Sequence, residues 1–357
     1  MVNKGIFVTE EISVKDALKR LDKTAEKVLL VVDDKRKLLG AITDGDIRRY
    51  ILKGRSLDNR IEEVYNKNPI SIKKSKYSDE VAKSIFLESR IELLPIVDES
   101  EKVIDSIIWS KLFADGQAPN MLQGKIDVPI VIMAGGKGNR LYPYTMVLPK
   151  PLIPIGDKPV VEVIINEFRK QGANNYYLTL NYKAKMIEAY FSNVERDYEL
   201  EFVQESEFSG TAGSLKMLED KISDTFIVSN CDVIVRANFG EVVNFHKEQN
   251  ADLTVLASIK HYKIPYGIIK FKEPGDVTSL DEKPEYTFTI NSGVYVLDKK
   301  TLEFIPKEGS FDMTDLIKSL IKSNKKVIMY PVNENDYVDV GQWEEYKKAT
   351  KKLKLFV

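Results

Sequence analysis

Hydrophobic residues in the second half of the chain form short runs that alternate with segments in which they recur at helical spacing. The run from Ile130 to Met133 is entirely apolar, as expected of a buried strand. Between residues 160 and 171, apolar residues recur every three or four positions until Gly172, which predicts a helix and its end. The pattern then predicts strands at 176–180, 200–203 and 226–229 and a helix at 184–191. This alternation predicts an α/β fold with a Rossmann-like, doubly wound, mainly parallel sheet.

The first 115 residues contain an internal repeat with an offset of 65 residues. Asp33, at the end of one apolar run, recurs as Asp98, and the same offset pairs Ser13 with Ser78. Each unit is predicted to contain a short strand, an amphipathic helix (14–22 and 79–89), two further strands and a closing helix. The two units are therefore expected to pack as one pseudo-symmetric module.

These patterns divide the chain into four parts. The repeats occupy residues 1–60 and 61–117, a linker follows at 118–128, and a larger domain occupies 129–357. The linker is predicted because the segment from Ala114 to Val128 has no hydrophobic periodicity and contains Gly, Pro and Asn.

Composition and charge exclude several classes of function. The formal net charge is −1, and no basic patch with interleaved aromatic residues is present, so we expect no nucleic-acid binding. No apolar run approaches the roughly 18 residues needed to cross a bilayer, and the N-terminus has no apolar signal-peptide core. We therefore expect a cytoplasmic protein without membrane attachment. Cys231 is the only cysteine, which excludes a disulfide within the chain, and we expect it to be buried and unreactive.

The first strand of the larger domain opens into a turn that contains Gly135, Gly136 and Gly138. Glycines there let the backbone turn sharply and bring N–H groups close to a bound anion. Arg140 follows the turn, and Lys150 stands between two prolines. The turn matches neither the Walker loop nor the dinucleotide fingerprint. Two glycines alone are equally consistent with a plain turn, but the turn together with two cations predicts a triphosphate site.

The whole stretch from Pro129 to Pro159 resembles the sugar-nucleotidyltransferase family, the sugar-1-phosphate pyrophosphorylases. The resemblance lies in G-G-K-G-N-R-L-Y-P-Y-T followed by P-K-P-L-I-P-I-G-D-K-P. Asn139 departs from the pattern, because the family usually has Thr or Ser there, and we expect one altered phosphate contact. The resemblance implies that the three glycines hold the triphosphate, that Arg140 neutralises the leaving pyrophosphate and that Lys150 binds the phosphates.

Two aspartates resemble the metal ligands of this family. Asp232 stands in N-C-D-V after a predicted strand, and Asp339 stands in D-V-G near the C-terminus. An aspartate after a strand is often only a turn residue, and nothing in the composition pairs these two. The resemblance implies that they hold Mg²⁺, a hard cation that prefers oxygen ligands and often binds substrate phosphates as well.

The segment Q-E-S-E-F-S-G-T-A-G-S-L at 204–215 resembles the base-binding segment of the family. It implies that Gln204, Gly210 and Thr211 contact the nucleotide, and it departs from the family at Ser209, where Leu is more usual. A plain helix with Thr211 or Ser214 as its N-cap explains the same residues, and both interpretations stay open.

Three later motifs resemble the half of the site that binds the acceptor sugar. They imply that Gly267, Glu282 and Asn291 bind the sugar and that Lys283 binds its phosphate. Each motif alone looks like ordinary turn or strand-edge chemistry. Their order and spacing after Asp232 carry the resemblance.

The N-terminal repeat resembles a tandem CBS pair, a module that senses adenine nucleotides. The segment G-A-I-T-D-G-D at 40–46 matches the element in which Thr43 and Asp46 hold phosphate and ribose. In the second repeat Ile108 and Lys111 stand at these positions, so we expect about one adenine or guanine nucleotide per chain. Asp46 as a helix cap and a purely structural or oligomerising role remain equally open. We also expect a homo-oligomer formed through these repeats.

The combined resemblance implies an enzyme of the EC 2.7.7 class, which transfers a nucleotidyl group from a nucleoside triphosphate to a sugar 1-phosphate with Mg²⁺. A CBS pair in front of N-C-D-V most resembles bacterial guanylyltransferases, in particular the glucosamine-1-phosphate guanylyltransferases of legionaminic acid biosynthesis. GTP and glucosamine 1-phosphate are the expected substrates. A uridylyl- or thymidylyltransferase for a hexose 1-phosphate and a catalytically inactive, nucleotide-sensing paralogue are the alternatives.

Overall fold

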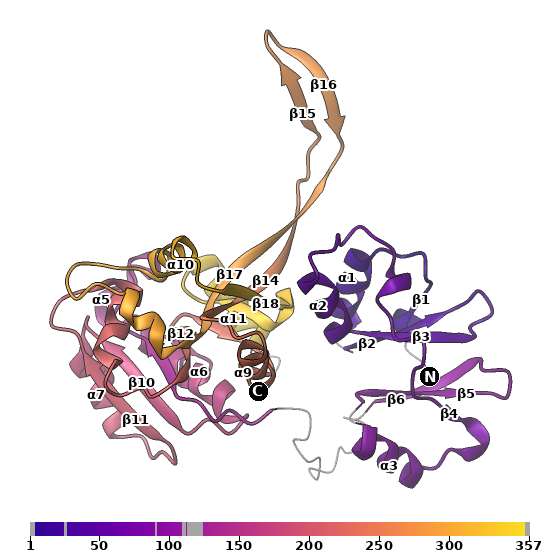
Figure 1. Cartoon of the computed structure of the whole chain (residues 1–357), viewed down its shortest axis with the longest axis horizontal. Coiled ribbons are helices and arrows are strands. Elements are labelled where there is room, and N and C mark those ends of the chain that lie inside the picture. Colours follow the sequence, from indigo (N-terminus) through magenta and orange to yellow (C-terminus); the bar gives the residue numbers. More distant parts are fainter. Residues whose placement is uncertain (1–3, 25–26, 90, 109–111, 113–123, 354–357) are drawn as a thin grey trace. The chain divides into compact units, whose positions relative to one another are not determined.

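The computed structural model describes residues 4–24, 27–89, 91–108, 112 and 124–353 (Figure 1). The chain forms two compact units, Met1–Gln123 and Gly124–Val357. Within the described ranges, no helix is long and apolar enough to cross a membrane.

The first unit contains two three-stranded sheets with the same topology. In the first sheet, β1 (Phe7–Val8) lies parallel to β2 (Val28–Val32), which is antiparallel to β3 (Leu38–Thr43). The second sheet repeats this order with β4 (Ile72–Lys73), β5 (Leu93–Val97) and β6 (Val103–Ile108). The helices of this unit include α1 (Val14–Thr24), α2 (Asp44–Leu52) and α3 (Asp79–Ser89), with 3-10 turns η1 (Lys4–Ile6), η2 (Ile61–Glu63) and η3 (Lys74–Lys76).

The repeat extends to individual hydrogen bonds. The carboxylate of Asp33 accepts two backbone N–H groups of the following turn at 2.9 and 2.8 Å, and Asp98 does the same at 2.9 and 3.0 Å. Arg36 and Glu101, which are also 65 residues apart, both adopt a left-handed φ, of 64° and 66°. The carbonyl of each accepts an N–H from the other repeat, at 3.0 and 2.9 Å. The predicted repeat is thus confirmed; the closing helix of its second unit and Lys111 lie outside the described residues.

The second unit is built on a seven-stranded sheet in the order β11-β10-β7-β12-β17-β14-β18. Its strands are β7 (Ile130–Met133), β10 (Asn175–Leu180), β11 (Glu199–Gln204), β12 (Thr225–Asn230), β14 (Leu253–Lys263), β17 (Glu285–Asp298) and β18 (Val327–Val332). Strand β17 is antiparallel to both of its neighbours, while the other pairings are parallel. The predicted mainly parallel sheet is therefore confirmed.

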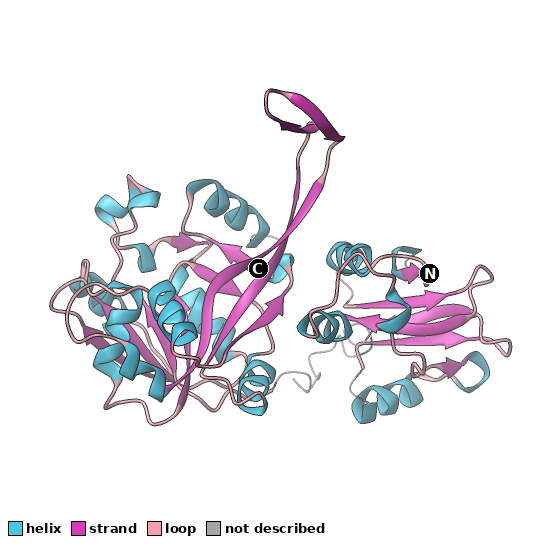
Figure 2. Ribbon diagram, turned by 45° about the horizontal axis from the view of Figure 1, so that its top comes forward, coloured by secondary structure: helices cyan, strands magenta, loops and turns pink. Residues whose placement is uncertain are grey.

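Helices cover both faces of this sheet, as Figure 2 shows. On one face, side chains of β7, β10 and β12 pack with α6 (Val160–Arg169), α7 (Ala184–Ser192) and α9 (Phe239–Glu248). On the other face they pack with α8 (Gly210–Gly213), η6 (Ser214–Leu218), η7 (Lys299–Phe304) and α10 (Met313–Lys322). Because successive side chains of a strand point to opposite faces, central strands covered on both faces are expected to be mostly apolar, and β7 is apolar throughout.

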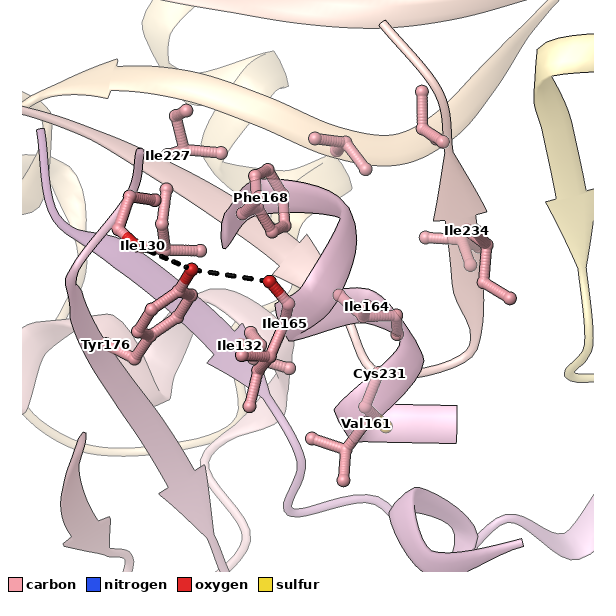
Figure 3. Close-up of a cluster of buried hydrophobic side chains, with 14 of the residues drawn as sticks. Ile130, Ile132, Val161, Ile164, Ile165, Phe168, Tyr176, Ile227, Cys231 and Ile234 are labelled. Carbon is pink, nitrogen blue, oxygen red and sulfur yellow. Dashed lines mark hydrogen bonds between the residues drawn. The ribbon is translucent and has the colours of Figure 1, made fainter. Parts of the chain in front are cut away.

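The hydroxyl of Tyr176 is buried in the core between the sheet and α6 and has two hydrogen-bond acceptors there (Figure 3). The hydroxyl of Tyr176 donates to the carbonyls of Ile165 and Ala173, at 3.3 and 3.2 Å. Cys231 lies in the same cluster, and burial raises the pKa of its thiol to about 12. The prediction of a buried cysteine is confirmed, and a thiol with this pKa stays protonated at neutral pH.

Smaller elements complete the second unit. They are η4 (Asn139–Leu141), α5 (Tyr144–Val147), η5 (Lys150–Leu152), β8 (Pro154–Ile155), β9 (Lys158–Pro159), β13 (Val233–Val235), η8 (Glu334–Asp336), β19 (Tyr337–Asp339) and α11 (Trp343–Leu353). Residues 124–128, which the sequence assigns to the linker, pack on this unit. Ile126 and Val128 are buried there, and the Ile126 N–H donates to the carbonyl of Gln171 at 2.9 Å.

Strands β14 and β17 extend beyond the sheet as a two-stranded ribbon. Their pairing continues from Ala257 opposite Asn291 to Lys263 opposite Glu285. The ribbon carries a hairpin of β15 (Ile268–Lys272) and β16 (Asp276–Asp281) at its end. Figure 1 shows the ribbon and hairpin standing out from the body of the unit, and residues 260–288 are called the arm below.

Candidate active site

The glycine turn, its two cations and the two predicted metal ligands gather where the order of strands in the sheet reverses. The chain runs from β7 through β10 to β11 on one side and then returns to place β12 on the other side of β7. The last residues of the two central strands, Met133 and Asn230, lie opposite each other. The turn at Gly135 and the carboxylate of Asp232 follow these strand ends, at the edge where ligands of open α/β sheets bind.

The three glycines of the turn have different surroundings. Gly138 has a φ of 68°, and a Cβ there would lie 3.0 Å from the Cβ of Lys150. A Cβ at Gly135 would lie 2.6 Å from Oε1 of Glu205, whereas one at Gly136 would meet no protein atom within 4 Å. Two glycines therefore allow close packing within the protein, and the third leaves the turn open toward solvent.

Two cations from this segment face Asp232. The ammonium of Lys150 forms an ion pair with Oδ2 of Asp232, and the lysine side chain is only 12% exposed. Nη2 of Arg140 lies 3.8 Å from the same oxygen, but its side chain is 65% exposed. Lys150 is thus held in place by burial, while Arg140 is free to reorient toward a bound anion.

The two predicted metal ligands are brought together by the short β13–β19 ladder, in which Val233 lies opposite Asp339. The Val340 N–H donates to the carbonyl of Asp232 at 2.8 Å, and the Gly341 N–H donates to Oδ1 of Asp339 at 2.7 Å. A Cβ at Gly341 would lie 2.1 Å from Oδ2 of Asp232 and 3.1 Å from Oδ1 of Asp339. The two carboxylate oxygens are therefore at most about 5.2 Å apart, the sum of these distances.

This pair of carboxylates fits a hard divalent cation. Burial, together with the negative charge of Asp232, raises the pKa of Asp339, although the Gly341 N–H opposes the shift. Among the described residues, no group of three or more His, Cys, Asp or Glu side chains could hold a metal by itself. Two carboxylates that share a metal with substrate phosphate oxygens match the way proteins bind Mg²⁺.

Glu205 belongs to the same edge of the sheet and was not selected from the sequence. It follows β11 and is only 6% exposed. Its Oε2 accepts the N–H and the hydroxyl of Ser209, at 3.1 and 2.8 Å, so the unusual serine fixes this carboxylate. Its Oε1 faces Gly135 and accepts no hydrogen bond from the part of the chain that the structure describes. Glu205 lies within the predicted base-binding segment 204–215, but the sequence alone does not show that its side chain is buried.

The other residues of this motif have structural partners. Gln204 is exposed at the end of β11, and Gly210 has a φ of 81° with the Phe311 carbonyl 2.6 Å from its Cβ position. The Thr211 N–H and hydroxyl donate to Oδ1 of Asp312, at 2.9 and 3.1 Å, and the hydroxyl accepts the N–H of Met313 at 2.9 Å. Thr211 thus binds the start of α10. The interpretation of Thr211 or Ser214 as a plain cap of its own helix is wrong, because Ser209 is the N-cap of α8 and Gly213 that of η6.

The predicted sugar-binding residues are divided between two places. Asn291 lies on β17 opposite Ala257, where its amide donates to the Tyr295 hydroxyl at 2.8 Å. Glu282 and Lys283 lie on the arm, with Nζ 3.5 Å from Oε1, and a Cβ at Gly267 would lie 2.9 Å from Oε2 of Glu282.

The arm group is separated from the edge by the length of the ribbon. From residue 291 to residue 285 alone, the strand spans roughly 20 Å at its usual rise per residue. The structure therefore brings the turn, the two cations and the two aspartates together, but not Gly267, Glu282 and Lys283.

In the first unit, Thr43 and Asp46 form a capping box at the start of α2. The Thr43 hydroxyl and N–H donate to Oδ2 of Asp46 at 2.6 and 2.8 Å, and the Asp46 N–H donates to Oγ1 of Thr43 at 3.2 Å. Arg49 binds the other oxygen of Asp46 at 2.6 Å. The alternative in which Asp46 caps a helix that starts at Ile47 is wrong in position, because the helix begins at Asp44 with Thr43 as its N-cap, and Asp46 completes the capping box from the third helical position. The nucleotide-binding role of both residues stays a prediction.

Comparison with known proteins shows two family models that match this chain and several similar proteins. Residues 130–354 match the model of the nucleotidyl transferase family, and residues 1–53 match that of the CBS domain. Similar curated proteins include the bifunctional protein GlmU of Methanocaldococcus jannaschii, 32% identical over 62% of this chain and 53% of that protein. They also include a UTP–glucose-1-phosphate uridylyltransferase of Synechocystis sp., 28% identical over 61% of each chain. A mannose-1-phosphate guanyltransferase of Yarrowia lipolytica is 30% identical over 62% of each chain. The chain thus spans about half to three fifths of the length of these relatives.

Among solved structures, HddC from Yersinia pseudotuberculosis in complex with GMP-PN is similar to the second unit. It has a TM-score of 0.50 and 27% identity, and the match covers 63% of this chain and 99% of that one.

Proposed function

The chain belongs to the nucleotidyl transferase family, and from this premise we propose that it transfers a nucleotidyl group from a nucleoside triphosphate to a sugar 1-phosphate. One observation carries the proposal: Lys150, Asp232 and Asp339 converge beside the glycine turn. A mostly covered lysine paired with Asp232 at a strand edge suited to phosphates supports an active enzyme over an inactive paralogue.

In the proposed reaction, an oxygen of the sugar 1-phosphate attacks the α-phosphorus of the nucleotide. A new P–O bond forms, the bond between the α-phosphorus and its bridging oxygen breaks, and pyrophosphate leaves with the bond electrons. The nucleophile is already an anion, so the protein need not remove a proton. Its contribution is positioning and charge stabilisation.

Each described residue has a distinct role in this scheme. Backbone N–H groups of the turn bind the triphosphate, and the exposed Arg140 moves onto the leaving pyrophosphate. Lys150 stays fixed beside the α-phosphate. Lys283 lies on the arm, away from this edge, and its assignment to the sugar phosphate rests on the sequence resemblance alone. Asp232 and Asp339 would hold Mg²⁺, which shields phosphate charge when bound.

Pyrophosphate release tests this reaction directly. The full chain is incubated with each common nucleoside triphosphate against a panel of sugar 1-phosphates, with and without EDTA. We expect activity that EDTA abolishes and that Asp232→Asn or Asp339→Asn reduces to near background. Full activity in EDTA would contradict the Mg²⁺ assignment, and no release with any pair would favour the inactive, nucleotide-sensing alternative.

The base assigned by this proposal is guanine, and the support is Glu205. A carboxylate only accepts hydrogen bonds. The Watson–Crick edge of guanine presents two adjacent donors, the ring N–H and the amino group, while uracil and thymine present one N–H between two carbonyls. A buried carboxylate whose Oε1 faces the nucleotide turn is therefore matched to guanine, whereas a uracil or thymine carbonyl beside it would be repelled.

Exchange of this carboxylate for an amide tests the base assignment. Glu205→Gln replaces one acceptor by a donor and keeps the size of the side chain. We expect kcat/KM for GTP to fall roughly 10- to 100-fold, which corresponds to one lost charged hydrogen bond, while that for UTP stays equal or rises. A wild-type preference for UTP or dTTP would support the uridylyl- or thymidylyltransferase alternative and leave the reaction class intact.

The acceptor that we propose from the sequence resemblance is glucosamine 1-phosphate, and the proposed product is a nucleotide sugar of legionaminic acid biosynthesis. The same pyrophosphate assay, run with GTP and glucosamine, mannose or glucose 1-phosphate, decides between acceptors. The largest kcat/KM for a sugar other than glucosamine would contradict the assignment.

A further inference from the structure

The hairpin at the end of the arm has one apolar and one polar face. Ile269 pairs with Leu280 and Phe271 with Val277, and residues that pair or alternate along a ribbon share a face. These four side chains are 56%, 63%, 69% and 65% exposed, in that order. A face made of four large apolar side chains is therefore open to water over more than half of its area.

The opposite face carries the charges of the hairpin. Lys272 lies opposite Asp276, and Nζ of Lys270 lies 3.3 Å from Oδ2 of Asp281. Charges thus pair with one another on one side, and the apolar face can be covered without burying an unpaired charge.

An uncovered apolar face is unfavourable in a hairpin of this kind. Two-stranded ribbons are marginally stable in water and become stable when a further layer packs on their apolar side. The four side chains expose on the order of 400 Å² of apolar surface, as large as the patches that mark binding sites on soluble proteins. Burying this face would therefore stabilise the hairpin.

A second cluster of exposed aromatic side chains lies on the ribbon of the arm. Tyr262, Tyr286 and Phe288 share one face of the ribbon, with ring centroids 5.9 Å apart for Tyr262–Phe288 and 6.2 Å for Tyr286–Phe288. They are 49%, 37% and 52% exposed. Together they add on the order of 300 Å², which brings the arm close to the roughly 800 Å² that each partner of a standard interface buries.

We infer that the arm binds the arm of a second copy of this chain, apolar face against apolar face, about a two-fold axis. A two-fold contact brings one patch against itself, so a hairpin face without charges can pack against its own copy. Two such hairpins form a four-stranded sandwich with both polar faces in water. The exposed area of the two clusters approaches that of a dimer interface, and no charge of the hairpin has to be desolvated; on the ribbon, Lys260 shares the face of Phe288 and its ammonium lies over the ring of Tyr337.

The test is the mass of the full-length protein in sedimentation velocity at micromolar concentration. The variant Phe271→Glu/Leu280→Glu places like charges on the apolar face, and the matched control Ser279→Glu adds a glutamate on the polar face opposite Lys270. We expect the wild type and the control to sediment as assemblies of equal mass and the double variant to have half that mass. The CBS repeats are predicted to associate as well, so the wild-type assembly can be larger than a dimer. A double variant with half the wild-type mass supports the inference for any size of that assembly.

Hydrogen exchange of unmodified protein keeps the inference testable if the double variant folds poorly. Amides of residues 268–281 should exchange slowly at high protein concentration and faster on dilution. Equal masses for the double variant and the wild type would overturn the inference. Slow exchange that does not change on dilution would also overturn it, because the face would then be covered by the same chain.

Discussion

Replacement of Gly341 by alanine is the change whose effect follows most directly from the geometry of the site. The added Cβ would lie 2.1 Å from Oδ2 of Asp232, whereas ordinary contacts begin near 3.4 Å. The carboxylate must therefore move by about 1.3 Å, the difference between these distances. Asp232 is buried and is held by Lys150, so it has no alternative position without loss of that ion pair. Misplacement of a reacting or metal-binding group by about 1 Å costs on the order of 100-fold in rate.

The assay is steady-state pyrophosphate release by the full chain, with Mg²⁺ titrated at saturating nucleotide and sugar phosphate. We expect Gly341→Ala to lower kcat about 100-fold and to shift half-maximal activity to higher Mg²⁺. Gly45→Ala is the control, because a Cβ there has its nearest neighbours at 3.5 Å, and it should keep wild-type kinetics. Thermal melting should show that both variants fold. A Gly341→Ala enzyme with wild-type kcat and Mg²⁺ dependence would refute the assignment of Asp232 and Asp339 as a metal site.

Three other changes give separate tests. Lys150→Ala should lower kcat by roughly two to three decades and reduce thermal stability, because it removes a fixed cation and leaves Asp232 buried without it; a near wild-type kcat would remove the lysine from the mechanism. Burial lowers the pKa of His246, although the hydrogen bond to Asp298 opposes this shift. Below about pH 6.5 the imidazole is therefore protonated in the unfolded state before it is protonated in the folded state. The free energy of unfolding of the wild type should then fall by up to about 1.4 kcal/mol per pH unit as the pH is lowered. Urea unfolding at pH 8 and 5.5 should show this loss in the wild type and a smaller one in His246→Asn; equal losses would contradict it. Asp46→Ala should weaken binding of AMP or ADP measured by calorimetry, while Thr43→Ser should retain it; no binding heat with wild type would leave the repeat as a structural module.

The central strands and the repeat could be predicted because their signals are local. Residues 130–133 must be apolar at every position because both faces of β7 are covered, and that requirement is visible in the letters themselves. The repeat likewise preserves short-range hydrogen bonds, such as those of Asp33 and Asp98, which depend on residues within the same turn. Features of this kind need no knowledge of what lies elsewhere in the chain.

Long-range contacts account for what the sequence did not reveal about the site. Asp232 and Asp339 are 107 positions apart in the sequence and meet only because β13 pairs with β19. Glu205 becomes significant only because its strand end lies beside Gly135, which places a buried acceptor next to the turn. This contact also explains why serine stands at position 209, where the family usually has leucine. The Ser209 hydroxyl orients the carboxylate of Glu205, and a leucine side chain could not donate that hydrogen bond.

The sequence of the arm predicts an apolar face that should be covered, but it does not predict which surface covers it. Apolar residues at 269 and 271 and at 277 and 280, separated by E-P-G-D, are the pattern of a hairpin with one face to be covered. The residues that resemble a sugar site, Glu282 and Lys283, stand at the base of the same hairpin. Whatever covers the apolar face must therefore restrict the position of these two side chains, because a ribbon held at its tip has less freedom at its base. Assembly and acceptor binding are thus expected to be linked, so that Phe271→Glu/Leu280→Glu should raise KM for the sugar phosphate more than KM for the nucleotide.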